Sequence, residues 1–330
     1  MTISNSVKKR FVKDYNLPIT MYRNDIFHYF IGLYEEHLNT LNKWDRLIDI
    51  HGRLGESGFF AESQKVIDNS IALISSHDSY KNFATLVSEE PIILTSTPEK
   101  RNIYHPDFVG KLLISIDMKK ANFNSMRFIA PEIFGENTTY ESFISQFTEF
   151  DYFAESKQIR QVIFGNLKPK AQQTAQRNIM MKTYELLLAH FGDMIEMVMT
   201  GPDEIVITDF SDLNIYTSDL IEQINKALIP LEIENCHSIN PFILDKVGGE
   251  KAFYVKVPYD LHREQLSKNG VFTDAKINYD VEFKQVPSFF YPQVFKKYFN
   301  LPICEYDFMF YHEGHYAKFL TGVFEEHDTN

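Results

Sequence analysis

The sequence is poor in cysteine and glycine, and this narrows the classes of protein that it can encode. It contains 2 cysteines, Cys236 and Cys304, among 330 residues. Two cysteines cannot build a disulfide framework or a cysteine-based zinc site, so a reducing compartment fits best. The 14 glycines are too few for a glycine-rich sandwich or a repeat array. We therefore expect a cytoplasmic protein, made inside a cell by the cell or by a virus.

Long hydrophobic runs are also missing. No stretch reaches the roughly 18 consecutive apolar residues of a membrane-spanning helix. The first residues, MTISNSVKKRFVKDYN, lack the apolar segment of a secretory signal. The sequence therefore predicts no membrane partner.

Positive charge is in the minority. Lys and Arg number 33 and Asp and Glu number 45, so the net charge is −12. A chain of this charge does not coat duplex DNA by charge alone. Hydrophobic residues make up 44% of the chain and aromatic residues 15%, which predicts a folded protein with an aromatic-rich core.

The hydrophobic pattern predicts an α+β fold with three regions. Apolar residues recur at helical spacing over residues 21–85, with a break at Gly52–Gly58. Short apolar runs and alternating stretches further along predict strands, and a long helix is expected between them. The strands are expected at 111–117, 194–199, 204–208 and within 251–290, and the long helix at about 155–190. The expected regions are a helical part (1–108), a central core (109–250) and a β-rich, aromatic part (251–330).

One segment of the sequence occurs twice. Residues 11–22, FVKDYNLPITMY, align without a gap on residues 295–306, FKKYFNLPICEY. The repeat has neither the period nor the copy number of a solenoid. It is interpreted as a recurring helix–turn–strand shape, with a partial duplication as the alternative.

Carboxylates stand at two points where nucleotide chemistry would need them. Asp117 ends the short apolar strand expected at 111–117, and Asp203 and Glu204 lie in the turn between two further strands. Nucleotidyl transfer uses close carboxylates to hold two Mg²⁺ ions roughly 3.5–4 Å apart. Mg²⁺ prefers oxygen ligands and keeps waters, so few side chains suffice. The pattern predicts a site for Mg²⁺ or Mn²⁺ on Asp117 and Asp203, with Glu204 assisting.

A basic segment lies between the two carboxylate motifs. No acidic residue occurs between Glu155 and Glu185. Because triphosphates and nucleic acids are polyanions, such a segment is expected to contact phosphate; the alternative is a solvated helix face. The candidate phosphate-binding residues are Lys157, Arg160, Lys168, Lys170 and Arg177.

These motifs, in this order, resemble the palm domain of template-dependent polymerases. Asp117, with Ala121 and Phe123, is similar to the first palm motif of reverse transcriptases. Lys157, with Phe164 and Gly165, resembles the helix motif of family B DNA polymerases. A Thr-x-x-x-Asn element of viral RNA polymerases is matched by Thr174 and Asn178. The turn Gly201-Pro202-Asp203-Glu204 resembles the palm hairpin, the Gly-Gly-Asp-Glu turn of nucleotide cyclases and the Asp-Glu pair of tRNA-histidine guanylyltransferases.

The resemblance implies a palm-like antiparallel sheet backed by helices and a polymerase-like nucleotidyl transfer. The expected partners are an NTP or dNTP, a single-stranded or primer-template nucleic acid, and further proteins. Asn122 and Phe123 could gate the sugar of the nucleotide, although a core position suits Phe123 better. Two alternatives remain: a nucleotide cyclase or signalling-nucleotide synthase on the same fold, and an inactive accessory subunit of a replication or viral assembly.

Overall fold

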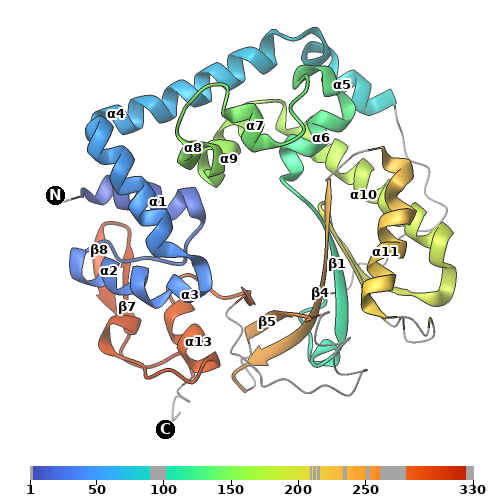
Figure 1. Ribbon diagram of the computed structural model, residues 1–330. Helices are drawn as coiled ribbons and strands as arrows, with labels where there is room; N and C mark the ends of the chain where they lie inside the picture. The colour runs from blue at the N-terminus through green and yellow to red at the C-terminus, as the bar shows by residue number, and fades with distance from the viewer. Residues whose placement is uncertain are drawn as a thin grey trace.

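The fold is described from a computed structural model, in which helices and an antiparallel sheet combine (Figure 1). The structure describes residues 3–89, 102–208, 210, 213, 216–232, 236–249, 253–260 and 280–324. Residues 90–101, in the expected helical part, and the middle of 251–290, where strands are expected, lie outside these residues. Among the described helices, none is long and apolar enough to cross a membrane.

The N-terminal part is helical, as the sequence predicts. Its helices are α1 (Asn5–Tyr15), α2 (Asn24–Leu33), α3 (Glu35–Leu38), α4 (Thr40–Ser76) and α5 (Asp78–Glu89). The break expected at Gly52–Gly58 falls at Gly55, whose φ of 68° and ψ of 174° interrupt α4. Figure 1 shows α4 bending and then arching over the molecule toward α5.

A six-stranded antiparallel sheet forms the second part of the molecule. Its strands run in the spatial order β2-β3-β1-β4-β5-β6. Three of them, β1 (Leu112–Met118), β2 (Glu196–Thr200) and β3 (Glu204–Thr208), match expected strands within two residues. The others are β4 (His237–Val247), β5 (Phe253–Pro258) and β6 (Glu282–Lys284).

The central strands and two helices form a β-α-β-β-α-β unit. Along the chain, β1 is followed by α10 (Pro169–Phe191), β2, β3, α11 (Thr217–Leu228) and β4. Side chains alternate along a strand, so Ile114 and Ile116 of β1 share one face of the sheet. This face packs on α10 and α11 in one buried apolar cluster. The other face carries Ser115 and Asp117. We call it the open face, because its apolar cluster includes no α-helix among the described residues.

The long helix expected at about 155–190 is two helices. The first, α9 (Lys157–Gly165), is separated from α10 by a turn in which Lys168 has a φ of 44°. Pro169 occupies the first turn of α10, where its missing N–H costs nothing, but it cannot continue a preceding helix. Between β1 and α9 the chain forms α6 (Ala121–Ile129), α7 (Tyr140–Ile144) and α8 (Asp151–Glu155).

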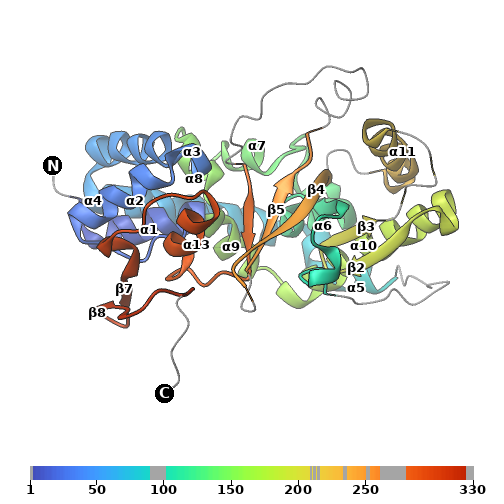
Figure 2. The same cartoon turned by 90° about the horizontal axis from the view of Figure 1, so that it is seen from below.

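The C-terminal part adds strands to the sheet and further elements beside the N-terminal helices. Because β5 pairs with β4, the boundary expected after residue 250 falls between two paired strands of one sheet. Farther along the chain come α13 (Tyr291–Tyr298), β7 (Met309–His312) and β8 (His315–Lys318). These elements lie beside α1 and α2 in both views (Figure 2).

The repeated segment forms the same helix end twice. Asn16 follows α1 with a φ of 51°, and Asn300 lies just after α13 with a φ of 53°. In the first copy Leu17 N–H donates to the Val12 carbonyl at 2.9 Å, and in the second Leu301 N–H donates to the Lys296 carbonyl at 2.8 Å. Both are Schellman-type caps, in which asparagine tolerates the left-handed backbone. The recurring helix and turn are confirmed, but the expected strand is wrong, since neither residues 17–22 nor 301–306 form one. Both copies contribute to one apolar cluster.

Candidate functional site

The site is centred on three carboxylates that the strand register brings together. Asp117 on β1 lies opposite Glu204 on β3. Directly opposite residues of an antiparallel pair have side chains on the same face, with Cβ atoms about 4.5–5.5 Å apart. Asp203 is the exposed residue before β3, and its carbonyl accepts the Met118 N–H at 2.8 Å. Asp117, Asp203 and Glu204 are therefore neighbours at one end of the open face.

The pKa of Asp117 reflects these neighbours. The carboxyl is half-buried, and its pKa is raised from 3.8 to about 6, mainly by burial. The negative charges of Glu204, Asp203 and Glu282 contribute to this rise, whereas the positive charge of Lys256 opposes it. A carboxyl with this combination of burial and like charges is typical of a functional site.

Glu204 is held by two further residues of the same face. Its Oε1 accepts a hydrogen bond from Ser115 Oγ at 2.5 Å and lies 2.6 Å from Nζ of Lys256. Lys256 is on β5, two strands away from β1, and its side chain is 9% exposed, against 19% for Glu204. Such a shielded pair is far less screened by solvent than a surface salt bridge.

The carboxylate end of the open face continues into an apolar patch. This patch is formed by Leu113, Val198, Val206, Phe242, Leu244 and Tyr254. Residues 103–109, just before β1, pack against it through Ile103, Tyr104, Phe108 and Val109. Burial, and then the charges of Glu204 and Glu282, raise the pKa of Tyr104. The segment thus places a phenol beside the carboxylates.

Two of the predicted cations lie on α9, whose N-cap residue is Ser156. The Ser156 hydroxyl caps this helix by accepting the Ile159 N–H at 3.0 Å. Burial lowers the pKa of Lys157, and the positive charges of Arg160 and Lys284 lower it further. The pKa of Arg160 is also lowered by burial, and its guanidinium lies 5.7 Å from the ring centre of Tyr140.

Lys157, Arg160 and Lys284 of β6 therefore form a cationic cluster. Within the described residues, no ion pair is found for Lys157 or Arg160. Lys284 pairs with Glu282 at 2.5 Å. Half-buried cations that repel one another favour an anion in their midst, and such a cluster suits phosphate.

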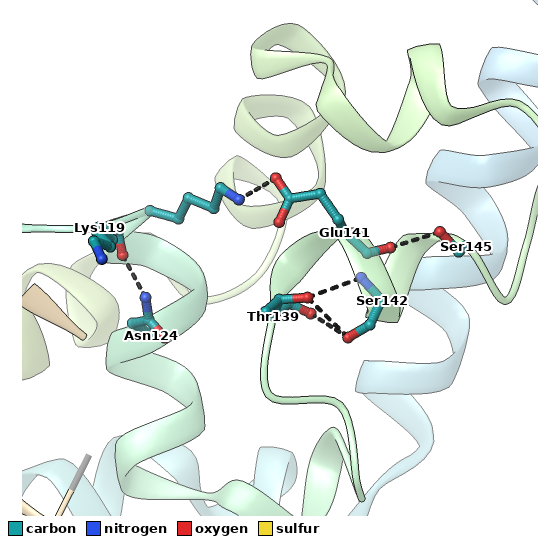
Figure 3. Close-up of polar contacts among 7 residues, drawn as sticks. Lys119, Asn124, Thr139, Glu141, Ser142 and Ser145 are labelled. Carbon is teal, nitrogen blue, oxygen red and sulfur yellow. Dashed lines mark hydrogen bonds and ion pairs between the residues drawn. The ribbon is translucent and has the colours of Figure 1, made fainter. Parts of the chain in front are cut away.

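The turn after β1 is fixed to α7. Lys120, with a φ of 44°, forms an ion pair with Glu141. Figure 3 shows Glu141 facing this turn from α7, and Thr139 capping the first turn of α7 through Ser142. In the same view the Asn124 amide donates to the Lys119 carbonyl. These contacts hold the end of β1, and with it Asp117, in place.

The other predicted residues lie away from the carboxylates or have structural partners. Nζ of Lys168 donates to the backbone carbonyls of Tyr80 at 2.6 Å and Lys81 at 2.7 Å. Lys170 and Arg177 are exposed on α10, the helix that covers the opposite face of the sheet. Their contact with phosphate remains a prediction.

The two candidate sugar-gating residues have different surroundings. Asn122 Oδ1 accepts a hydrogen bond from Gln176 of α10 at 2.6 Å. Phe123 is 1% exposed and packs edge-on against Phe134, with ring centres 4.7 Å apart. The core position that suits Phe123 in the sequence is the one that it occupies.

The sequence reasoning missed four residues of the site, namely Ser115, Tyr104, Lys256 and Lys284. Lys256 carried a signal, because it interrupts the apolar run from Phe253 to Val257. A charged residue within such a strand is rarely buried without a partner. The partner, Glu204, is 52 residues earlier in the chain, so the sequence alone does not connect them.

The donor set of the site is made of oxygen atoms, as hard cations require. Among the described side chains, no group of three or more His, Cys, Asp or Glu is arranged to hold a metal ion. Mg²⁺ is commonly held by one or two carboxylates together with substrate phosphates and water. Asp117 and Asp203 suit such a site, whereas Glu204 is engaged by Lys256.

Three comparisons with known proteins gave no match. No protein-family model matches the chain, and no significantly similar protein was found among curated proteins or solved structures.

Proposed function

We propose that the protein is a palm-type, template-dependent nucleotidyltransferase. The observation that carries the proposal is the register of β1 and β3, which sets Asp117 opposite Glu204 and beside Asp203. They stand at one end of the open face of a β-α-β-β-α-β sheet whose other face is covered by helices. This topology, with acids on the first strand and in the hairpin, resembles polymerase palms.

The reaction would join a nucleotide to a nucleic-acid end. The 3′-oxygen forms a bond to the α-phosphorus of an NTP or dNTP, the bond to the β-phosphate oxygen breaks, and pyrophosphate leaves. The hydroxyl proton passes to solvent. Bound Mg²⁺ would lower the pKa of the hydroxyl and neutralise charge on the phosphates. Asp117 and Asp203 would hold the ion, and Glu204 would support them.

The cationic cluster supports the same proposal. Lys157 and Arg160 are half-buried, and Lys157 lies close to both Arg160 and Lys284. Among the described residues neither forms an ion pair, and the charge of Glu141 offsets only part of the burial of Arg160. A triphosphate carries the charges that this cluster lacks, and it would reach from the carboxylates toward α9. Of the five predicted basic residues, we therefore assign the triphosphate to Lys157 and Arg160.

Primer extension tests the proposal. The wild-type protein, given Mg²⁺, a primer-template and the four nucleotides, is expected to lengthen the primer. Asp203→Ala and Asp117→Ala should each slow extension by about 100-fold or more, because metal-assisted charge stabilisation is worth several kcal/mol. Asp25→Ala is the matched control, since Asp25 is an exposed acid of α2 paired with Arg23. Extension that survives both site substitutions would overturn the proposal.

A second candidate function is supported by the ion pair of Glu204 with Lys256. An acid engaged by a lysine is a weaker metal ligand, as expected of a palm that has become an accessory subunit. Such a protein would neither extend a primer nor convert an NTP without primer, and it would bind a protein of a replication or viral assembly. Conversion of an NTP without primer would instead indicate a cyclase or signalling-nucleotide synthase.

A further inference from the structure

Lys256, from the far half of the sheet, places its ammonium among the carboxylates. It starts on β5, and its ammonium lies 2.6 Å from Glu204 Oε1 on β3, across β4 and β1. The same ammonium lies over the ring of Phe242, 4.7 Å from the ring centre. The side chain is therefore extended along the open face and shielded from water.

The ammonium occupies the place of a cation. It contacts the oxygen of Glu204 that also accepts the Ser115 hydroxyl. Its positive charge is also felt at Asp117. A two-metal site would need this region for a second divalent ion, because the two ions lie roughly 3.5–4 Å apart. A second ion could bind there only if Lys256 moved away.

We propose that the Lys256 ammonium permanently fills one of the two cation positions, so that the carboxylates bind a single divalent ion. This inference rests on the proposed function. Asp117 and Asp203 would hold the ion, while Glu204 is a positioning residue for Lys256. One divalent ion and the ammonium together balance the charge of the three carboxylates. Two divalent ions beside the ammonium would exceed the charge of these carboxylates.

The stoichiometry of Mn²⁺ binding tests the inference without relying on activity. Free Mn²⁺ is counted by electron paramagnetic resonance while Mn²⁺ alone is titrated into the full-length protein. The wild type is expected to bind about one ion per chain. Lys256→Ala should gain a second ion, because Glu204 loses its lysine partner and becomes a ligand. A merely structural lysine would not cause a gain of binding.

Two further variants keep the result interpretable. Lys256→Met retains an aliphatic chain over Phe242 and should also gain the second ion, even if the alanine variant folds poorly. Lys246→Ala is the matched control, because it removes an exposed lysine from the adjacent strand β4. This control should still bind one ion.

The outcomes separate the inference from the proposed function. Two ions on the wild type, or one ion on both Lys256 variants, would overturn the inference and leave the nucleotidyl-transfer proposal standing. No Mn²⁺ on the wild type would overturn both. The inference holds only if the count rises from one ion to two on removal of the Lys256 charge.

Discussion

Asp117 and Glu204 lie directly opposite each other on β1 and β3, and their surroundings differ. Glu204 accepts a hydrogen bond from Ser115 and faces the ammonium of Lys256. Asp117 is half-buried, and its pKa is raised to about 6, first by burial and then by the charges of Glu204 and Asp203. The two acids thus have separate tasks: Glu204 orients a lysine, and Asp117 holds a charge that costs stability at neutral pH.

Asp117→Asn is expected to stabilise the protein at pH 7.5. The folded protein binds the Asp117 proton more tightly than the unfolded chain does, so wild-type stability falls as the pH rises from about 4 to about 6. Because solvent screens the charge of a half-buried group, the gain should be about 1 kcal/mol. Urea unfolding at pH 4 and pH 7.5 measures it.

The dependence on pH provides the control for this prediction. The stabilising effect of Asp117→Asn should disappear at pH 4, where the wild-type carboxyl is protonated in the folded state. Because the ionised carboxyl is the metal ligand, wild-type affinity for Mn²⁺ should rise through about pH 6. A stabilising effect of equal size at both pH values would contradict the assignment.

Substitutions of the basic residues should divide into two groups. Lys157→Ala and Arg160→Ala are expected to weaken nucleoside triphosphate binding about tenfold or more, since a hydrogen bond to a charged group contributes 1.5–3 kcal/mol, a general range. Lys168→Ala should leave the affinity unchanged and lower the free energy of unfolding by about 1 kcal/mol. Its ammonium is already bound to the carbonyls of Tyr80 and Lys81. Calorimetric titration and urea unfolding separate the two effects.

The sequence predicts the local parts of the site well. The apolar run ending at Asp117 and the turn at Pro202 and Asp203 have strong local signals. A strand end and a hairpin are short-range features, so β1 and the β2–β3 hairpin could be predicted. The pairing of β1 with β3, which creates the site, is a long-range contact that no local pattern specifies.

Other parts could not be predicted, for identifiable physical reasons. No strand is predicted at β4, because Pro241 interrupts the segment and proline is depleted in central strands. In the structure Pro241 lies opposite Ile114 of β1, and the pairing with β5 starts only at Phe242. The role of Lys256 depends on this sheet order, so it too remained hidden.

Asp14→Ala is expected to destabilise the helical part strongly. This buried carboxylate accepts hydrogen bonds from Arg10 at 2.8 Å, Tyr152 at 2.7 Å and Ser156 at 2.5 Å. Removing one partner of a buried charge network costs about 3–5 kcal/mol, because the remaining groups lose their compensation. Asp25→Ala removes an exposed acid that also pairs with an arginine and should have a far smaller effect. Equal effects in urea unfolding would contradict the network's importance.

Two glycines of α4 should respond oppositely to alanine. Gly55 has a φ of 68° and a ψ of 174°, a backbone region open essentially only to glycine, so Gly55→Ala should cost about 1–3 kcal/mol. Gly52 lies within the helical part of α4, and a Cβ there would have no atom within 4 Å. Gly52→Ala should therefore stabilise by about 0.5–1 kcal/mol. Thermal unfolding of both variants measures the contrast, and a gain of stability in Gly55→Ala would show that the bend in α4 is not maintained in solution.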